Sequence, residues 1–184
     1  QGMSGIMDIN GEPNGPPTRV GFYISDLVTP MFACYSIVAA MRERDRTGLG
    51  QYLDVSMMDT LTSLMFMENL EEAMETGEDL RQGNNVRGAP MGVYQASDGE
   101  VTITVASDDQ WRRVAEAFDA PDLLKNRDFV DYVSRSINVK AARLAIQKLV
   151  SCYTRNEVLA RLERHDVPCG PVRTVADAVE DMHF

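Results

Sequence analysis

The sequence has few of the residues that build metal centres and disulfide frameworks. Its 184 residues include three cysteines and two histidines. Cys34, Cys152 and Cys169 form no CxxC pair, and the histidines are widely separated from them and from each other. An odd number of scattered cysteines without a ligand cluster excludes a disulfide scaffold and predicts no metal site. We therefore expect reduced cysteines and a cytoplasmic protein.

Basic charge and long apolar runs are also scarce. Lys and Arg number 18 against 28 Asp and Glu, giving a net charge of −10. Without a basic stripe, this balance disfavours nucleic-acid binding. The longest apolar run, 27–41, contains Thr, Pro and Ser and is shorter than the roughly 20 residues that a membrane span needs. We expect no membrane partner and interpret this run as a buried helix.

The remaining composition is that of a globular protein. The chain is 44% hydrophobic and 25% charged, close to the averages of folded domains, so disordered and fibrous classes are excluded. Small molecules or a second copy of the chain are the expected partners.

Glycine and proline divide the chain. Residues 77–91 are rich in Gly, Asn and Pro and lack periodicity, so they are a predicted linker. Before it, residues 1–76 predict a helix over 27–46, a strand over 52–56 and a second helix from Ser56 to about Thr76. This alternation predicts part of a large α/β domain with a Rossmann-like layer.

Residues 92–184 predict a small α+β domain. The segment 92–106 reads as a hairpin with a Ser-Asp-Gly turn and period-two apolar residues. Capping boxes at Ser107 and Thr154 predict helix starts, a last strand is expected at 172–173, and Thr174 is expected to cap a terminal helix.

Asp26 is the main candidate for chemistry. It stands where an extended segment turns into the apolar helix. Pro30 lacks an N–H and its ring would clash with the carbonyl of Asp26, so the helix is predicted to start no earlier than Asp26 or Leu27. Asp26 is then an N-cap, where free N–H groups favour an ionised carboxylate. A structural cap and a nucleophile need the same geometry, so spacing alone leaves both roles open.

The motifs around Asp26 resemble those of class III CoA-transferases. They are Gln1-Gly-Met-Ser-Gly5, Gly11-Glu-Pro-Asn-Gly-Pro-Pro-Thr-Arg-Val-Gly21, the Arg-Thr-Gly-Leu-Gly-Gln run of 46–51 followed by Asp-Val-Ser, and Asp-Val-Pro-Cys-Gly-Pro-Val at 166–172. This family also includes carnitine dehydratase, bile-acid-inducible F proteins, formyl-CoA transferase and α-methylacyl-CoA racemase.

The resemblance implies a function for Asp26. By position it matches the aspartate that transferases of the family acylate, so an acyl-CoA and a small carboxylic acid are the expected substrates, with coenzyme A carried as the thioester. In the racemases the matching aspartate exchanges the proton α to the thioester, opposite a histidine that would lie just before Gln1. A third alternative is a non-catalytic fragment or interaction module in which Asp26 is only a cap.

The resemblance has three further implications. Transferases of the family cover the acylated aspartate with a glycine-rich loop, which makes Arg87, Gly88 and Ala89 candidate substrate-loop residues. The family forms interlinked homodimers, so a homodimer is expected. Most of its CoA contacts precede the segment that matches Gln1, so we expect the chain to be an internal part of a longer protein and inactive alone.

Overall fold

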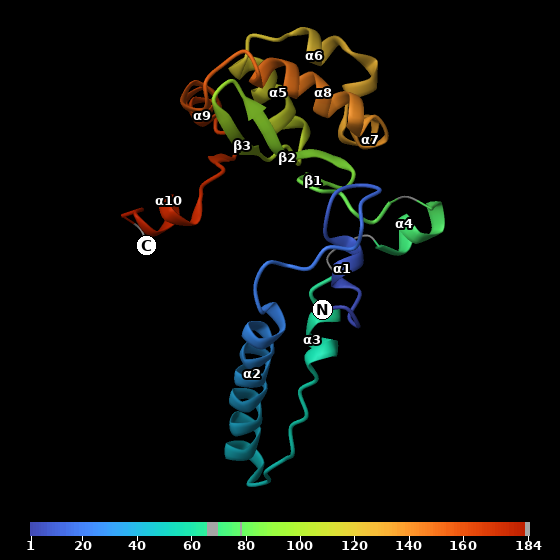
Figure 1. Ribbon diagram of the computed structural model, residues 1–184, viewed down its shortest axis with the longest axis vertical. Coiled ribbons are helices and arrows are strands. Elements are labelled where there is room, and N and C mark those ends of the chain that lie inside the picture. The colour runs from blue at the N-terminus through green and yellow to red at the C-terminus, as the bar shows by residue number, and fades with distance from the viewer. Residues whose placement is uncertain (66–69, 78, 183–184) are drawn as a thin grey trace. The chain divides into compact units, whose positions relative to one another are not determined.

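The chain is a mixed α/β protein that divides into two compact units. The computed structural model describes residues 1–65, 70–77 and 79–182 (Figure 1). The N-terminal unit is Gln1–Gly83 and the C-terminal unit is Asn84–Phe184. The division falls within the predicted linker 77–91, but that segment also contains a short strand and the start of a longer one.

The N-terminal unit is helical and has a small core. Its helices are α1 (Ile6–Ile9), α2 (Ile24–Thr47), α3 (Met57–Ser63) and α4 (Leu70–Thr76). The buried cluster consists of Ile6, Leu61 and Met65, with Met7, Ile9, Val20, Ile24 and Leu70 packed against it. Only the first residue of α2 joins this cluster, so the core fixes where the helix starts and leaves its length uncovered.

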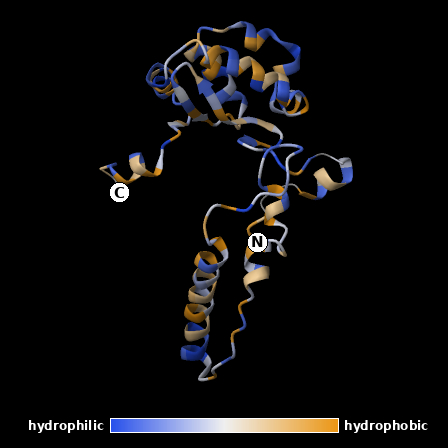
Figure 2. Cartoon of the chain, viewed as in Figure 1, coloured by the Kyte–Doolittle hydropathy of each residue, from blue (hydrophilic) through white to orange (hydrophobic). Residues whose placement is uncertain are grey.

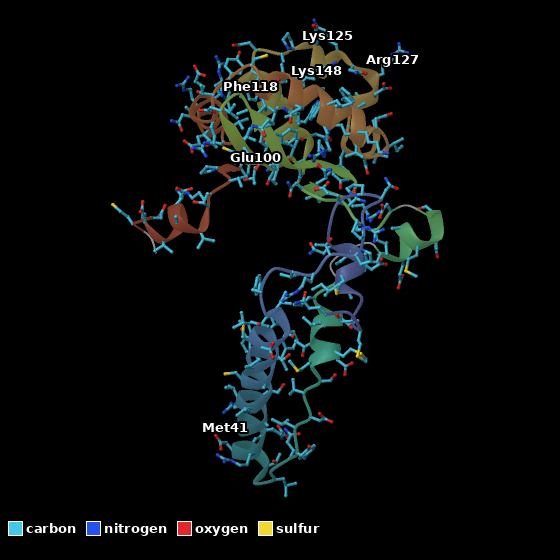
Figure 3. The ribbon with its side chains drawn as sticks, viewed as in Figure 1. Met41, Glu100, Phe118, Lys125, Arg127 and Lys148 are labelled. Carbon is cyan, nitrogen blue, oxygen red and sulfur yellow. The ribbon has the colours of Figure 1, made fainter. Side chains whose placement is uncertain are left out.

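The prediction that the apolar helix is buried is wrong for this chain. Helix α2 has no buried residue, and Tyr35 and Val38 are 68% and 61% exposed. Figure 2 shows that α2 is apolar along most of its length, and Met41 stands out near its far end in Figure 3. Within the described residues, α3 is the element that α2 contacts most. An exposed apolar surface that extends along most of a helix indicates a site where another surface binds.

Helix α2 also changes the expectation about membranes. With 24 residues, Ile24–Thr47, it is long and apolar enough to cross a bilayer by length and composition. The estimate from the run 27–41 was too short because the helix extends beyond that run at both ends. A core helix of a soluble protein and a signal sequence near an N-terminus pass the same test.

Two other predictions fail in the N-terminal unit. Residues 52–56 form no strand, because a strand exists only where a neighbour completes its ladder. The helix expected from Ser56 to Thr76 is divided, since α3 ends at Ser63 and α4 begins at Leu70. Residues 66–69, which the prediction also covered, lie outside the described residues.

The C-terminal unit is built on one antiparallel sheet. Its strands are β1 (Asn85–Val86), β2 (Ala89–Ala96), β3 (Gly99–Ile103) and β4 (Cys169–Pro171), in the order β1-β2-β3-β4. Ala96 pairs with Gly99, which confirms the predicted hairpin and its turn at Ser97-Asp98. The last strand ends at Pro171, just before the predicted position.

Several helices of this unit pack on the sheet. The helices of the unit are α5 (Asp108–Ala117), α6 (Asp122–Lys125), α7 (Tyr132–Ile137), α8 (Val139–Val150), α9 (Arg155–Arg164) and α10 (Val175–Val179), with a 3₁₀ turn at Arg127–Phe129. Ser107, Thr154 and Thr174 accept the predicted N-cap hydrogen bonds. Helix α8 packs on β2, α9 packs on β3 and β4, and α5 packs on α9. The core between them includes Tyr94, Val101, Trp111, Ile146 and Leu162.

Candidate active site

Asp26 lies in the first turn of α2 and is not its N-cap. The helix begins at Ile24 and its N-cap is Tyr23, so the predicted cap position is wrong. Pro30 lies inside the helix, so the carbonyl of Asp26 lacks its intrahelical N–H donor, and this does not stop the helix from starting at Ile24. The first turn closes instead through the N–H of Leu27, which donates to the carbonyl of Tyr23 at 3.1 Å.

A tight turn directs the chain into α2. Tyr23 has φ −80° and ψ 63°, and the N–H of Ile24 donates to the carbonyl of Phe22 at 2.9 Å. These values define an inverse γ-turn. The tyrosine side chain makes no capping hydrogen bond. Among the described residues, the N–H groups of Ser25 and Asp26 have no acceptor, so the helix start keeps two unpaired donors.

The carboxylate of Asp26 is exposed and unpaired. It has no hydrogen bond or ion pair to any described residue. It occupies the third helical position. A charged, accessible carboxylate beside two free N–H groups can attack an electrophilic carbon, and the N–H groups can stabilise the oxyanion that forms.

The predicted substrate-loop residues form a tight hairpin turn. Val86 pairs with Ala89, so Arg87 and Gly88 are the turn between β1 and β2. Gly88 has φ +65°, a conformation that glycine adopts without strain. Ala89 is only 1% exposed. These residues belong to the C-terminal unit and Asp26 to the N-terminal unit, so the structure does not assign them to one site.

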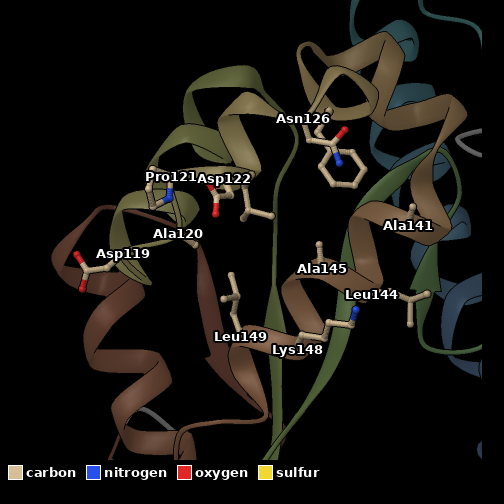
Figure 4. Close-up of a pocket in the computed structure, with 12 residues that line it drawn as sticks. Asp119, Ala120, Pro121, Asp122, Asn126, Ala141, Leu144, Ala145, Lys148 and Leu149 are labelled. Carbon is tan, nitrogen blue, oxygen red and sulfur yellow. The ribbon is translucent and has the colours of Figure 1, made fainter.

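The C-terminal unit contains a separate hollow of about 610 Å³ that the sequence did not indicate (Figure 4). Its lining is mainly apolar and includes Leu123, Phe129, Leu144 and Leu149 together with Lys148. Neither Asp26 nor the turn at Arg87 lines it. Across the part of the chain that the structure describes, no group of three or more His, Cys, Asp or Glu side chains is placed to hold a metal.

These observations define a mixed α/β protein with an accessible carboxylate at the start of a long apolar helix. The sequence pattern of CoA-transferase family III matches residues 1–184, and the chain belongs to this family. The family resemblance of the sequence motifs is thereby confirmed.

Two curated relatives are CoA-transferases. The succinyl-CoA:mesaconate CoA-transferase of Haloarcula hispanica is 35% identical over 100% of this chain and 46% of its own length. The acetyl-CoA:oxalate CoA-transferase of Acetobacter aceti is 36% identical over 97% of this chain and 46% of its own length. The chain thus spans less than half the length of these relatives.

Solved structures share the fold. A CaiB/BaiF family protein from Brucella suis superposes with a TM-score of 0.73 at 30% identity, over 100% of this chain and 49% of that one. A protein from Mycobacterium tuberculosis gives a TM-score of 0.80 at 19% identity, over 100% of this chain and 48% of that one. The second likeness concerns the fold alone.

Proposed function

We propose that the protein containing this chain transfers CoA from an acyl-CoA to a carboxylic acid, with Asp26 as the nucleophile. The observation that carries the proposal is the accessible, unpaired carboxylate of Asp26 beside the free N–H groups of Ser25 and Asp26. Family membership and the two CoA-transferase relatives support the reaction class.

In the proposed reaction, a carboxylate oxygen of Asp26 attacks the thioester carbon and CoA leaves as the thiolate, which gives a mixed anhydride. The thiolate then attacks the aspartyl carbonyl, releases the first carboxylate and forms an aspartyl thioester. An acceptor carboxylate attacks the carbonyl of that thioester, the C–S bond breaks and CoA leaves as the thiolate, which gives a second anhydride. The thiolate finally attacks the acceptor's carbonyl, which yields the new acyl-CoA and returns Asp26 to its carboxylate form.

The helix start has a role in each of these steps. Every attack passes through a tetrahedral species with negative charge on one oxygen, and fixed N–H donors stabilise such charge. The donors of Ser25 and Asp26 are already unpaired, so no bond within the protein has to break before they bind the oxyanion. We infer small carboxylic acids as acceptors, because the curated relatives are named for mesaconate and oxalate.

We further propose that the complete protein is a cytoplasmic homodimer in which other surfaces cover α2. Its apolar residues, such as Leu27 with 59% and Tyr35 with 68% of its surface exposed, form a surface whose contact with water is unfavourable. Racemase chemistry and a purely structural role for Asp26 are the alternatives. Proton exchange at the α-carbon without an acceptor would indicate the former, and full activity without the carboxylate would indicate the latter.

The test uses the complete protein, with any sequence that flanks this chain. Acyl-CoA is added without acceptor, hydroxylamine traps activated carboxyl groups, and peptide mass spectrometry locates the modification. We expect an aspartyl hydroxamate on the peptide that contains Asp26 and a loss of transfer activity of about 10³-fold or more in Asp26→Asn. Asp45→Asn is the matched control, because Asp45 is an exposed acid of the same helix whose partner is Arg44.

A further inference from the structure

The side chain of Gln1 binds the main chain that leads into α2. Its Oε1 accepts a hydrogen bond from the N–H of Val20 at 2.8 Å, and its Nε2 donates to the carbonyl of Phe22 at 3.2 Å. The carbonyl of Gln1 in turn accepts from Ser4 Oγ at 3.1 Å. One amide therefore holds the chain on both sides of Gly21.

The carbonyl of Phe22 connects this amide with the start of the helix. It accepts from Gln1 Nε2 and also from the N–H of Ile24 across the γ-turn at Tyr23. Because two donors fix this one oxygen, they fix the plane of the peptide that precedes Tyr23. The direction of the first turn, and with it the side chain of Asp26, follows from that plane.

Apolar packing holds the same segment from another side. Val20 and Ile24 pack against the buried cluster of Ile6, Leu61 and Met65. Hydrophobic contact is not directional, so it fixes the position of the segment more than the rotation of its peptides. Hydrogen bonds are directional, and the amide of Gln1 supplies them next to the helix start, where the N-cap residue Tyr23 makes no side-chain hydrogen bond.

We propose that Gln1 is a positioning residue for Asp26: its amide fixes the Phe22 peptide and thereby aims the carboxylate and the free N–H groups of the helix start. This inference rests on the proposed function in taking Asp26 as the nucleophile. Both printed hydrogen bonds of the Gln1 side chain go to main-chain atoms of described residues, so loss of the amide affects the rate of the chemical step more than substrate binding.

Kinetics of Gln1→Met in the complete protein test this role, because methionine has a similar size and neither hydrogen bond. We expect kcat to fall about 10- to 100-fold, the range that misplacement of a reacting group causes, with KM within about twofold. Gln51→Met is the matched control. Gln51 is exposed and follows α2, and this substitution should leave kcat unchanged.

The variant Gln1→Glu adds a readout that a purely structural role would not give. A glutamate carboxylate accepts from Val20 but cannot donate to Phe22, whereas a protonated carboxyl group can do both. The ratio of variant to wild-type kcat should therefore rise severalfold from pH 8 to pH 5, where about one sixth of an ordinary glutamate is protonated. If Gln1→Met does not fold, the pH dependence of this kcat ratio tests the positioning role by itself.

Hydrogen exchange separates the positioning role of Gln1 from the proposed function of Asp26. In Gln1→Met, the amides of Ile24 and Leu27 should exchange faster than in the wild type, whatever the function of Asp26. If Asp26→Asn is inactive but Gln1→Met has the kcat of the wild type, the positioning role is overturned. It is also overturned if the ratio of Gln1→Glu to wild-type kcat does not change between pH 8 and pH 5. Full activity of Asp26→Asn instead overturns the proposed function, and the exchange rates then show whether Gln1 orders this segment.

Discussion

Asp26 differs from two other acidic residues at helix starts, Glu157 and Asp177. Glu157 and Asp177 occupy the same third position of their helices, and each completes a capping box with the threonine before the helix. Asp26 has no such partner, because its N-cap is Tyr23, which makes no capping hydrogen bond. The carboxylate is therefore available for chemistry, and the structure offers no capping role that would explain it.

The capping acids predict a pH dependence of stability. Hydrogen bonds from Thr154, that of its backbone N–H before that of its hydroxyl, lower the pKa of Glu157. Hydrogen bonds from Thr174, that of its hydroxyl before that of its backbone N–H, lower the pKa of Asp177. A lowered pKa in the folded state stabilises the protein above the ordinary pKa of the group. That stability is lost as the pH falls through the lowered value.

Urea unfolding of the C-terminal unit should therefore show a falling midpoint as the pH is lowered from about 6 to about 3. Glu157→Gln should have a lower midpoint at pH 6 and a flatter pH dependence, because glutamine does not titrate. Glu163→Gln is a control on the same helix outside the capping box. An unchanged slope in Glu157→Gln would contradict this account.

At the scale of the elements, side chains and loops close the part of β2 that β1 leaves unpaired on the side away from β3. Gln147 on α8 accepts from the N–H of Gln95 at 3.0 Å and donates to its carbonyl at 2.8 Å. The N–H of Val93 donates to Asn84, and that of Ser97 donates to Tyr153. An open edge strand pairs with other chains, so these bonds protect the sheet.

Removing the amide of Gln147 should reopen this edge. Gln147→Leu keeps the side-chain size and loses both bonds, so we expect a loss of about 1 kcal/mol in the free energy of unfolding. We also expect more aggregation on heating. Lys140→Leu, at an exposed position of the same helix, controls for the added apolar surface. Equal unfolding and light scattering in the two variants would argue against edge protection.

Local signals predicted the elements whose determinants are local. The hairpin of β2 and β3 and the caps at Ser107 and Thr154 depend on residues a few positions apart, and the structure has them. The strand at 52–56 failed because it depends on a neighbour elsewhere. Asp26 was identifiable from the motifs around it, but its unpaired state and the contacts of Gln1 were not, since residues about 20 positions away determine them.

At the scale of the whole molecule, the two units differ in the size of their hydrophobic cores. The C-terminal unit buries a large cluster that includes Trp111, Val114, Ile146 and Leu162. In the N-terminal unit the cluster has three buried residues, Ile6, Leu61 and Met65. Helix α2 adds exposed apolar surface and nothing buried. A unit folds alone only when its buried area offsets the entropy of ordering the chain.

Separate expression of the units should show this difference. Residues 84–184 should be monomeric and unfold cooperatively in urea, whereas residues 1–83 should aggregate or lack a cooperative transition. Circular dichroism and sedimentation measure both properties. A monomeric, cooperatively unfolding 1–83 would mean that α2 needs no cover, which contradicts the proposed assembly.

The central claim concerns one carboxylate, and trapping it during turnover tests the claim most directly. Mass spectrometry of the complete protein, after exposure to acyl-CoA and hydroxylamine, should find the hydroxamate at Asp26. The modification should be absent without acyl-CoA and unaffected by Asp45→Asn. An unmodified Asp26 in an enzyme that still transfers CoA, or full activity of Asp26→Asn, would contradict the account.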